Sequence, residues 1–348
     1  MKKTFFDFFP TPKFITMPSS GLLLADENIF FVNLVRGKKG ELLLKEYGRE
    51  QIPGMIIQNG DIKNPKEIVE LLTAFRKKYD ISFIKTSLPD EKSFLFRTTI
   101  PKMSLSEIRE ALQFKIEENV PILANEAIFD FQVLPWEDPE AKEIQVVVSV
   151  VSEEVVFNYL NILKESGFKP VMFEIESQSV TRAVVSRGDM RPYIIVNAGA
   201  GKVGLYIVDR GLVQFTSNLN LDKDFFSSLT FSQKEEGNIK YGDGQGVVYT
   251  KAADTERILK DEIDKLLAYW SSFNPTSKAK IEKIILCGEG ALDPNIKNYF
   301  KTYFSFPLEL ANVWTNAFSL DRITPDLTFE ESFKYAAAIG LALPHNTH

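Results

Sequence analysis

Residues 193–215 read YIIVNAGAGKVGLYIVDRGLVQF, in which three apolar runs are separated by two short turns that contain glycine. This pattern predicts three antiparallel strands joined by tight turns. A second stretch, GLLLADENIFFVNLVRGKKGELL at residues 21–43, has the same order of strand, polar turn, strand, turn and strand. Because one copy lies in each half of the chain, we predict two domains related by internal duplication.

Composition sets broad limits on the function. The chain has 348 residues, of which 44% are hydrophobic and 25% charged, as expected for two folded domains. Its net charge is −6 and it lacks a long cluster of Lys and Arg, so a nucleic-acid partner is not expected. The longest apolar runs, VVVSVV and YAAAIGLAL, are shorter than the roughly 20 residues that cross a bilayer. We therefore expect a folded cytoplasmic protein.

Cysteine and histidine are scarce. Cys287 is the single cysteine, and both histidines, His345 and His348, lie in the last four residues. A chain of this kind has no internal disulfide and no Ser-His-Asp triad, Cys-His pair or His/Cys metal site in its body. We predict no catalytic residues and no metal ligands. The N-terminal MKKTFFDFFPTPKF is interrupted by Asp7, Pro10 and Pro12, so it is interpreted as an arm over residues 1–17 rather than a signal peptide.

The region after residue 92 has a different pattern. Strands are predicted in SFLFRTTI, AIFDFQVL and IQVVVSVV, with helices over 104–119 and 153–166. Ser104 and Glu107 have the spacing of a capping box at the start of the first helix. This β-α-β-β-α order predicts an inserted subdomain over 93–167. The alternative is that these strands belong to one continuous sheet.

Three long phrases carry a family resemblance: IPGMIIQNGDIKNP, RTTIPKMSLSEIREALQFKIEENVPILANEAIFDFQVL and ILKESGFKPVMFEIESQSVTRAV. They resemble the PilM family of actin-like proteins in type IV pilus assembly, and the resemblance extends from about Pro18 to Leu343. It implies an α/β, actin-like (ASKHA-type) fold made of two duplicated domains with an inserted subdomain. The implied first domain comprises residues 18–92 and 168–191, and the second comprises 192–348, with a helical subdomain near 222–275.

The resemblance also implies where a nucleotide site would lie. In actin-like ATPases two hairpins surround the phosphates, with glycines for close backbone approach and acidic residues that hold Mg²⁺ or orient water. In the first hairpin the aspartate position of the family falls on Leu23, the glycine or serine position on Ala25 and the lysine position on Phe30. Asp26 remains in the turn. The first hairpin therefore lacks its metal-positioning acid.

The second hairpin and the adenosine loop are better preserved. The family's D-x-G becomes Asn197, Ala198 and Gly199, and the glycine triplet before a later helix contains a glutamate. If nucleotide binding is retained, the binding residues are Asn197, Gly199, Gly201, Lys202, Gly288, Glu289 and Gly290. The alternative is that the glycines only form turns and that Lys202 is a solvated turn residue. Since both acidic positions are lost, we predict no enzyme activity and no required cofactor, with ATP and Mg²⁺ as the ligand only if binding persists.

The function implied by the resemblance is that of a scaffold. PilM-like proteins lie at the cytoplasmic face of the inner membrane and bind the N-terminal cytoplasmic peptide of PilN in a groove between the first domain and the inserted subdomain. They couple this complex to the pilus motor ATPase. An extended peptide would use a strand edge with apolar pockets beside it. Of Phe94, Phe96, Phe129 and Phe131, alternation along the strands predicts that about half face outward.

Other functions stay open at this point. One is an ATP-binding conformational switch of the same machinery. A second is the cytoplasmic docking module of a type II secretion system, whose GspL-like proteins normally continue into a transmembrane segment that we do not expect here. A small-molecule kinase ranks third, since the expected hairpin position carries no catalytic aspartate.

Overall fold

The structure is a computed structural model that describes residues 20–37, 40–134, 142–199, 201–221, 251–273 and 280–344. The N-terminal arm expected at residues 1–17 lies outside the described residues. Residues 222–250, which belong to the helical subdomain expected near 222–275, also lie outside the described residues. The described part of that region contains helix α7 (Lys251–Ser272).

The first lobe is built on a five-stranded sheet. Its order is β3-β2-β1-β6-β10, in which β1, β2 and β3 form an antiparallel meander and β6 and β10 run parallel to β1. The strands are β1 (Ser20–Leu24), β2 (Asn28–Arg36), β3 (Leu42–Gln51), β6 (Phe83–Leu88) and β10 (Lys169–Ile175). The meander coincides with the first of the two predicted hairpin units.

The second lobe repeats this arrangement. Its sheet has the order β13-β12-β11-β14-β15, again with an antiparallel meander followed by two parallel strands. The strands are β11 (Tyr193–Gly199), β12 (Lys202–Asp209), β13 (Leu212–Asn220), β14 (Lys283–Cys287) and β15 (Leu308–Leu310). The matching strand order confirms the internal duplication predicted from the sequence.

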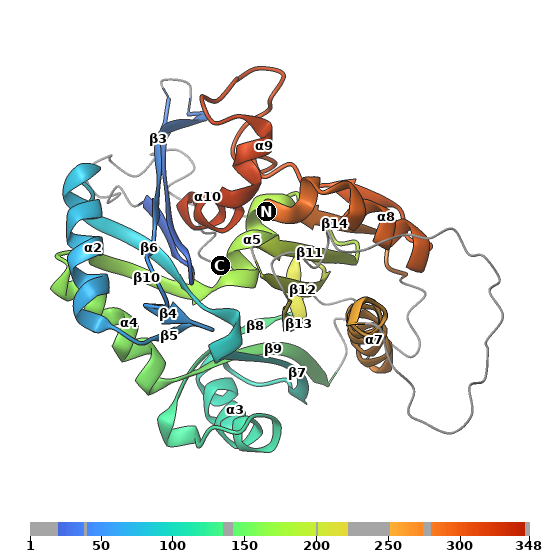
Figure 1. The fold of residues 1–348 in the computed structure, drawn as a ribbon. Helices are drawn as coiled ribbons and strands as arrows, with labels where there is room; N and C mark the ends of the chain where they lie inside the picture. The colour runs from blue at the N-terminus through green and yellow to red at the C-terminus, as the bar shows by residue number, and fades with distance from the viewer. Residues whose placement is uncertain are drawn as a thin grey trace, which may run out of the picture.

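Helices cover the outer faces of the sheets and fill the space between them (Figure 1). α2 (Pro65–Lys78) and α4 (Glu153–Glu165) pack on the first sheet, and α7 and α8 (Pro294–Tyr303) pack on the second. α5 (Glu176–Val184) and α10 (Ala336–Ala342) lie between the lobes in contact with each other. A Cβ on Gly340 would overlap the carbonyl oxygen of Ser179, so this crossing requires glycine.

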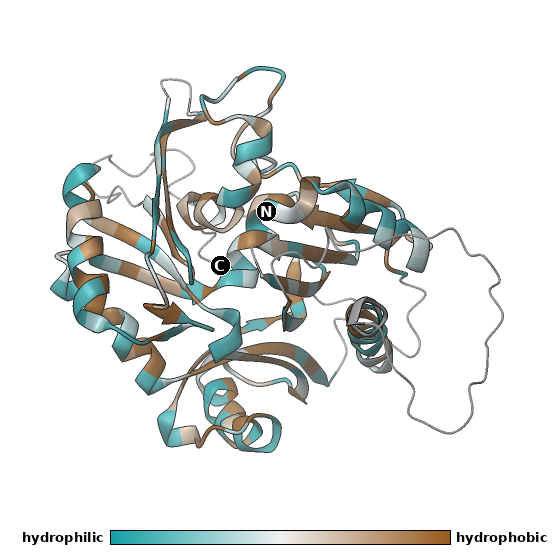
Figure 2. Cartoon of the chain, viewed as in Figure 1, coloured by the Kyte–Doolittle hydropathy of each residue, from teal (hydrophilic) through white to brown (hydrophobic). Residues whose placement is uncertain are grey.

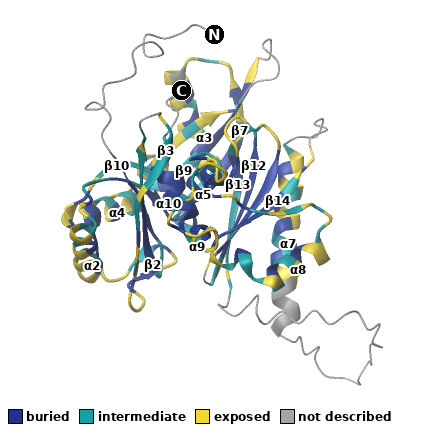
Figure 3. Cartoon of the chain, turned by 90° about the horizontal axis from the view of Figure 1, so that it is seen from above, coloured by how far each residue is buried: buried dark blue, intermediate teal, exposed yellow. Residues whose placement is uncertain are grey.

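Sequence signals explain how α2 begins and which face it buries. Asn64 caps its N-terminus, accepting a hydrogen bond from the Glu67 N–H, and Pro65 occupies the first turn. Ile68, Leu72 and Phe75 are buried on one stripe. The outer helices are accordingly polar outside, whereas the sheet strands between them are largely hydrophobic (Figure 2) and buried (Figure 3).

The inserted block contains a three-stranded antiparallel sheet of order β7-β9-β8 with α3 on one face. Its elements are β7 (Ser93–Pro101), α3 (Leu105–Asn119), β8 (Ala127–Val133) and β9 (Glu143–Ser152). The predicted capping box of Ser104 and Glu107 is present. Buried residues of this sheet and α3 form their own hydrophobic core, which is separate from the cores of the two lobes.

Two expectations about this block need correction. The buried side chains of α4, Tyr159, Ile162 and Leu163, belong to the core of the first lobe, so by packing the inserted unit ends near β9 rather than at residue 167. The second concerns the four phenylalanines of β7 and β8. Phe96 and Phe129 are buried, and Phe94 and Phe131 pack partly buried against the same core. All four occupy the alternate positions that face α3, so the expectation that half point outward is wrong.

The remaining short elements connect these units. They are β4 (Ile57–Gln58), β5 (Asp61–Ile62), η1 (Asp90–Lys92), η2 (Ala124–Glu126), η3 (Glu289–Leu292), α9 (Phe329–Ser332) and η4 (Phe333–Tyr335), where η denotes a 3₁₀ helix. Within the residues that the structure describes, no helix is both long and apolar enough to span a bilayer.

Candidate functional site

A cleft of about 400 Å³ separates the two lobes. Several of the segments that line it directly follow β1, β6, β10, β11 and β14, and thus lie at the carboxyl ends of these strands. In open α/β sheets the carboxyl ends of parallel strands are the usual place for a ligand. The cleft is therefore the candidate site that the fold itself creates.

The second hairpin reaches into this cleft. Gly199 of β11 pairs with Lys202 of β12, so the connection between the strands is tight. Gly201 has a φ of 74°, a left-handed conformation that glycine adopts without strain. Of the seven residues predicted for nucleotide binding, six line the cleft: Asn197, Gly199, Gly201, Lys202, Gly288 and Glu289. The seventh, Gly290, lies behind them against Ala198.

The loop after β14 approaches the second hairpin closely. Gly288 has a φ of 84°, and a Cβ on it would lie 2.7 Å from the side-chain oxygen of Asn197. Glu289 starts the short helix η3, and its carboxylate pairs with Lys334 at 3.2 Å. The glycine-containing triplet thus opens a 3₁₀ turn, whereas α8 begins later with Asp293 as its N-cap.

The first hairpin presents apolar groups where the ATPase family has polar ones. Leu23 and Phe30 are each 6% exposed and belong to a hydrophobic core. The Phe30 ring packs edge-on against Tyr335, with centroids 5.1 Å apart. The carboxylate of Asp26 accepts hydrogen bonds from the backbone N–H groups of Asn59, at 2.9 Å, and Gly60, at 3.0 Å. Asp26 is thus held by the first lobe itself.

Four acidic residues of the cleft were missed at the level of sequence: Glu27, Asp90, Glu91 and Glu176. The last three follow the end of β6 or β10, so an acidic residue just after a strand was the available signal for them. Oδ1 of Asp90 accepts from the N–H of Ser177 at 3.1 Å and from its hydroxyl at 3.0 Å. Oε1 of Glu176 accepts from the Asn197 amide at 3.2 Å.

Burial dominates the electrostatics of these acids. It raises the pKa of Asp90 above its usual value, against the opposing effect of the hydrogen bonds from Ser177. Burial also raises the pKa of Glu176, and the nearby charges of Asp90 and Asp26 raise it further, while the hydrogen bond from Asn197 lowers it. Because the buried acids Asp90 and Glu176 interact with each other, it is unfavourable for both carboxylates to be ionised at the same time.

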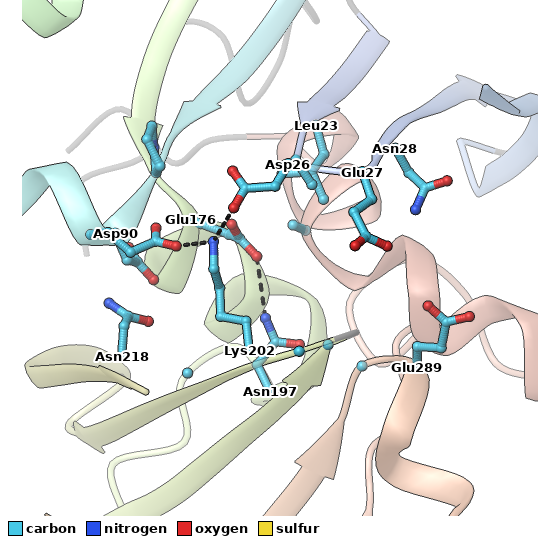
Figure 4. A pocket seen from close by; sticks show the side chains of 18 of the residues that line it. Leu23, Asp26, Glu27, Asn28, Asp90, Glu176, Asn197, Lys202, Asn218 and Glu289 are labelled. Atoms are coloured by element: carbon cyan, nitrogen blue, oxygen red, sulfur yellow. Dashed lines mark hydrogen bonds and ion pairs between the residues drawn. The ribbon is translucent and has the colours of Figure 1, made fainter. Parts of the chain in front are cut away.

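Lys202 is the cation at the centre of the cleft (Figure 4). Its ammonium lies 3.5 Å from Oδ2 of Asp26 and forms a closer ion pair with Glu91. The other lining lysine, Lys334, pairs with Glu289. Both cations of the cleft lining are therefore engaged by carboxylates of the chain.

These residues do not fit a magnesium nucleotide. The two hairpin positions that would carry metal-positioning acids hold Leu23 and Asn197. The lining carboxylates, which are Asp26, Glu27, Asp90, Glu91, Glu176 and Glu289, outnumber the lysines, and both lining lysines are already paired with carboxylates of the chain. Among the described ranges no group of three acidic, Cys or His side chains has the arrangement of a metal site.

Comparison with known proteins identifies the fold and the family of this chain. Two sheets of identical order around a cleft, with an inserted sheet in the first lobe, define an actin-like fold. The family model described as "Type IV pilus assembly protein PilM" matches residues 21–346. The chain belongs to this family.

One solved structure supports the actin-like fold over most of the chain. The chain is similar to one in the structure titled "PilM-PilN type IV pilus biogenesis complex", with 21% identity, a TM-score of 0.70, and coverage of 94% of this chain and 98% of that chain. Ethanolamine utilization protein EutJ from Carboxydothermus hydrogenoformans matches with 11% identity and a TM-score of 0.46, over 96% of this chain and 91% of its own. MreB5 of Spiroplasma citri bound to AMPPNP matches with 14% identity and a TM-score of 0.44, over 93% and 95%. No curated protein matches the chain significantly.

Proposed function

We propose that this protein is a scaffold of the type IV pilus assembly complex that binds the N-terminal cytoplasmic peptide of a PilN-like membrane protein. The observation that carries the proposal is the match of the family model across residues 21–346, in a chain that has Leu23 and Asn197 at the two hairpin positions where an actin-like ATPase carries acidic residues. The similarity to a chain of a PilM-PilN complex supports the choice of partner. In this role the protein lies at the cytoplasmic face of the inner membrane and needs no turnover.

The edge of β8 is the place where we propose that the peptide adds. In the described part of the chain, β8 pairs with β9 alone, so its other edge has no strand partner. The carbonyl of Phe129 on β8 accepts a hydrogen bond from the Arg109 guanidinium at 3.3 Å. An extended peptide would form main-chain hydrogen bonds along such an edge and place alternate side chains on either side of it.

Exposed apolar side chains near this edge offer contacts for the peptide. Ile128 on β8 is 41% exposed and pairs with Val151, just before α4 begins. Phe157 on α4 is 45% exposed. We propose that Ile128 and Phe157 make the apolar contacts with the peptide. The strand phenylalanines had been expected to make them, but Phe94, Phe96, Phe129 and Phe131 face α3.

A fluorescence-polarisation titration tests this proposal. The probe is the labelled N-terminal peptide of the PilN-like protein from the same genome. We expect Ile128→Glu and Phe157→Glu each to weaken binding by at least about 2 kcal/mol, the size of a hot-spot truncation. Phe114→Glu is the matched control, because Phe114 lies on α3 and is already 76% exposed. Circular dichroism checks that each variant is folded.

The possible outcomes distinguish an error in the proposed partner from an error in the proposed binding position. No saturable binding of the peptide up to the millimolar range would contradict the scaffold proposal itself. Binding that is weakened by Phe114→Glu but not by Ile128→Glu or Phe157→Glu would contradict only the β8 edge.

An ATP-binding switch of the same machinery is the second candidate function. The observation that favours it is the presence of Gly199, Gly201 and Lys202 in the cleft, where a phosphate loop would lie. Calorimetric titration with ATP and Mg²⁺ at millimolar concentration tests it, and heat with a clear stoichiometry would support the switch. A contact with the pilus motor ATPase stays a prediction. The type II secretion module likewise stays an alternative prediction.

A further inference from the structure

One lysine connects the two lobes across the cleft. Lys202 begins β12 of the second lobe, whereas its two partners belong to the first lobe. Asp26 lies in the turn between β1 and β2, and Glu91 lies in η1 at the entry to the inserted block. Figure 4 shows the Lys202 side chain extending from the second hairpin toward the carboxylate of Asp26. The Lys202 side chain therefore crosses the cleft in which a ligand between the lobes would bind.

Asp26 extends this contact to a second turn. Its carboxylate accepts the backbone N–H groups of Asn59 and Gly60, which both have positive φ, 49° and 73°. Successive N–H groups in this kind of conformation form a concave site for an anion. Here the anion is supplied by the chain itself.

The same turn is held from the other side by the elements that flank the inserted sheet. The Tyr159 hydroxyl on α4 donates to the carbonyl of Gly60 at 3.0 Å. Lys92 of η1 pairs with Asp61 at 2.8 Å, directly after the turn. A continuous set of contacts thus runs from Lys202, through Asp26 and the turn at residues 59–60, to both ends of the inserted block.

We propose that the ion pairs of Lys202 with Asp26 and Glu91 close the two lobes in place of a bound magnesium nucleotide. The ammonium supplies a positive charge between the lobes, and the two carboxylates of the first lobe supply the negative charges that pair with it. The side chains involved are largely shielded: Lys202 is 27% exposed, Asp26 26% and Glu91 12%. Their attraction is therefore less screened than that of a surface pair. The closed arrangement then needs no nucleotide.

Thermal unfolding with and without ATP and Mg²⁺ is the first test. Lys202→Met leaves Glu91 and Asp26 without their cation, so we expect the Tm to fall by about 3 °C or more, whereas Lys202→Arg retains most of the Tm. Lys265→Met is the matched control, because Lys265 forms only an exposed pair within α7 and should change the Tm by less than about 1 °C. Adding ATP and Mg²⁺ should leave the wild-type Tm unchanged.

A distance measurement is the second test. Spin labels at Glu70→Cys on α2 and Asn298→Cys on α8 report the separation of the lobes, and native Cys287 is fully buried and does not interfere. We expect a narrow distance distribution in the labelled wild type without nucleotide, and a broader one after Lys202→Met. Glu91→Gln should broaden it too, and adding Glu91→Gln to Lys202→Met should have little further effect.

Two results would overturn the proposal. One is a wild-type Tm that rises with ATP and Mg²⁺ and loses this rise in Lys202→Met, which would make Lys202 a phosphate ligand. The other is an unchanged Tm and distance distribution in Lys202→Met. Since neither measurement uses a peptide, failure here is distinguishable from failure of the proposed partner binding.

Discussion

The side-chain amide of Asn197 donates a hydrogen bond to the carboxylate of Glu176, from one lobe to the helix between the lobes, over 3.2 Å. Asn197 stands where the ATPase family has an aspartate. A carboxylate at this position could not donate, and it would add a negative charge beside the buried acids Glu176 and Asp90. Asn197 therefore replaces a possible metal ligand and also stabilises the buried Glu176 carboxylate through its hydrogen bond.

Restoring the acid should therefore harm the protein. We expect Asn197→Asp to lower the free energy of unfolding by about 1–3 kcal/mol, because a buried hydrogen bond is lost and like charges are brought together. Urea denaturation followed by circular dichroism measures the change. The variant should also gain no ATPase activity, since Leu23 still occupies the other acidic position. An Asn197→Asp protein as stable as the wild type would show that Glu176 and Asn197 are not coupled.

Glu176 should make stability depend on pH. Its pKa is raised by burial and by the charges of Asp90 and Asp26, so the folded state binds this proton more tightly than the unfolded chain does. Stability from this group is fully present below its usual pKa of 4.5 and is lost as the pH rises from there toward the raised folded value. We expect Glu176→Gln to be more stable than the wild type at pH 8, by at least about 1 kcal/mol, with little difference at pH 4.5.

Urea denaturation of both proteins across this pH range measures the difference, and comparing them cancels the contributions of other titrating groups. The side chains facing Glu176 are Asp90, Asp26, Asn197, Tyr206 and Cys287, and Glu176→Gln leaves all of them in place. If Glu176→Gln were less stable than the wild type at pH 8, the carboxylate would be a net stabilising charge, contrary to this prediction.

The crossing of α5 and α10 between the lobes depends on Gly340. A Cβ at this position would overlap the carbonyl of Ser179, and both lie on backbone that has little room to move. We expect Gly340→Ala to destabilise the fold by about 3 kcal/mol or more, as overpacking of a tight core does. Gly199→Ala is the matched control, because a Cβ there meets its nearest atom at an ordinary 3.5 Å and should cost less than about 1 kcal/mol. Equal losses in the two variants would argue against this explanation.

Much of the fold could be predicted because local patterns fix it. The hairpin units, the capping box at Ser104, and the positions of α3 and α4 all agree with the structure within a residue or two. The four strand phenylalanines were misassigned although the period of two along a strand was enough to place them on one face. The place of α4 could not be predicted, since nothing in its amphipathic pattern says which of two neighbouring cores it joins.

The candidate site was only partly predictable. The glycines and Lys202 of the second hairpin were expected there from the family resemblance, and they line the cleft in the structure. Asp90, Glu91 and Glu176 come from segments far apart in the sequence, and their contacts with Lys202 and Asn197 exist only after both lobes fold. The burial that raises the pKa values of Asp90 and Glu176 is likewise a property of the assembled cleft.

The final prediction concerns turnover. We expect no hydrolysis of ATP above background in a phosphate-release assay, because a magnesium ion or attacking water needs a carboxylate at the hairpin positions, and these hold Leu23 and Asn197. Lys202, the cation that could stabilise a transferring phosphoryl group, is engaged by Glu91 and Asp26. The Lys202→Ala variant is the control, since any contaminating ATPase would survive this change. Turnover in the wild type that disappears in Lys202→Ala would show that the cleft is an active site after all.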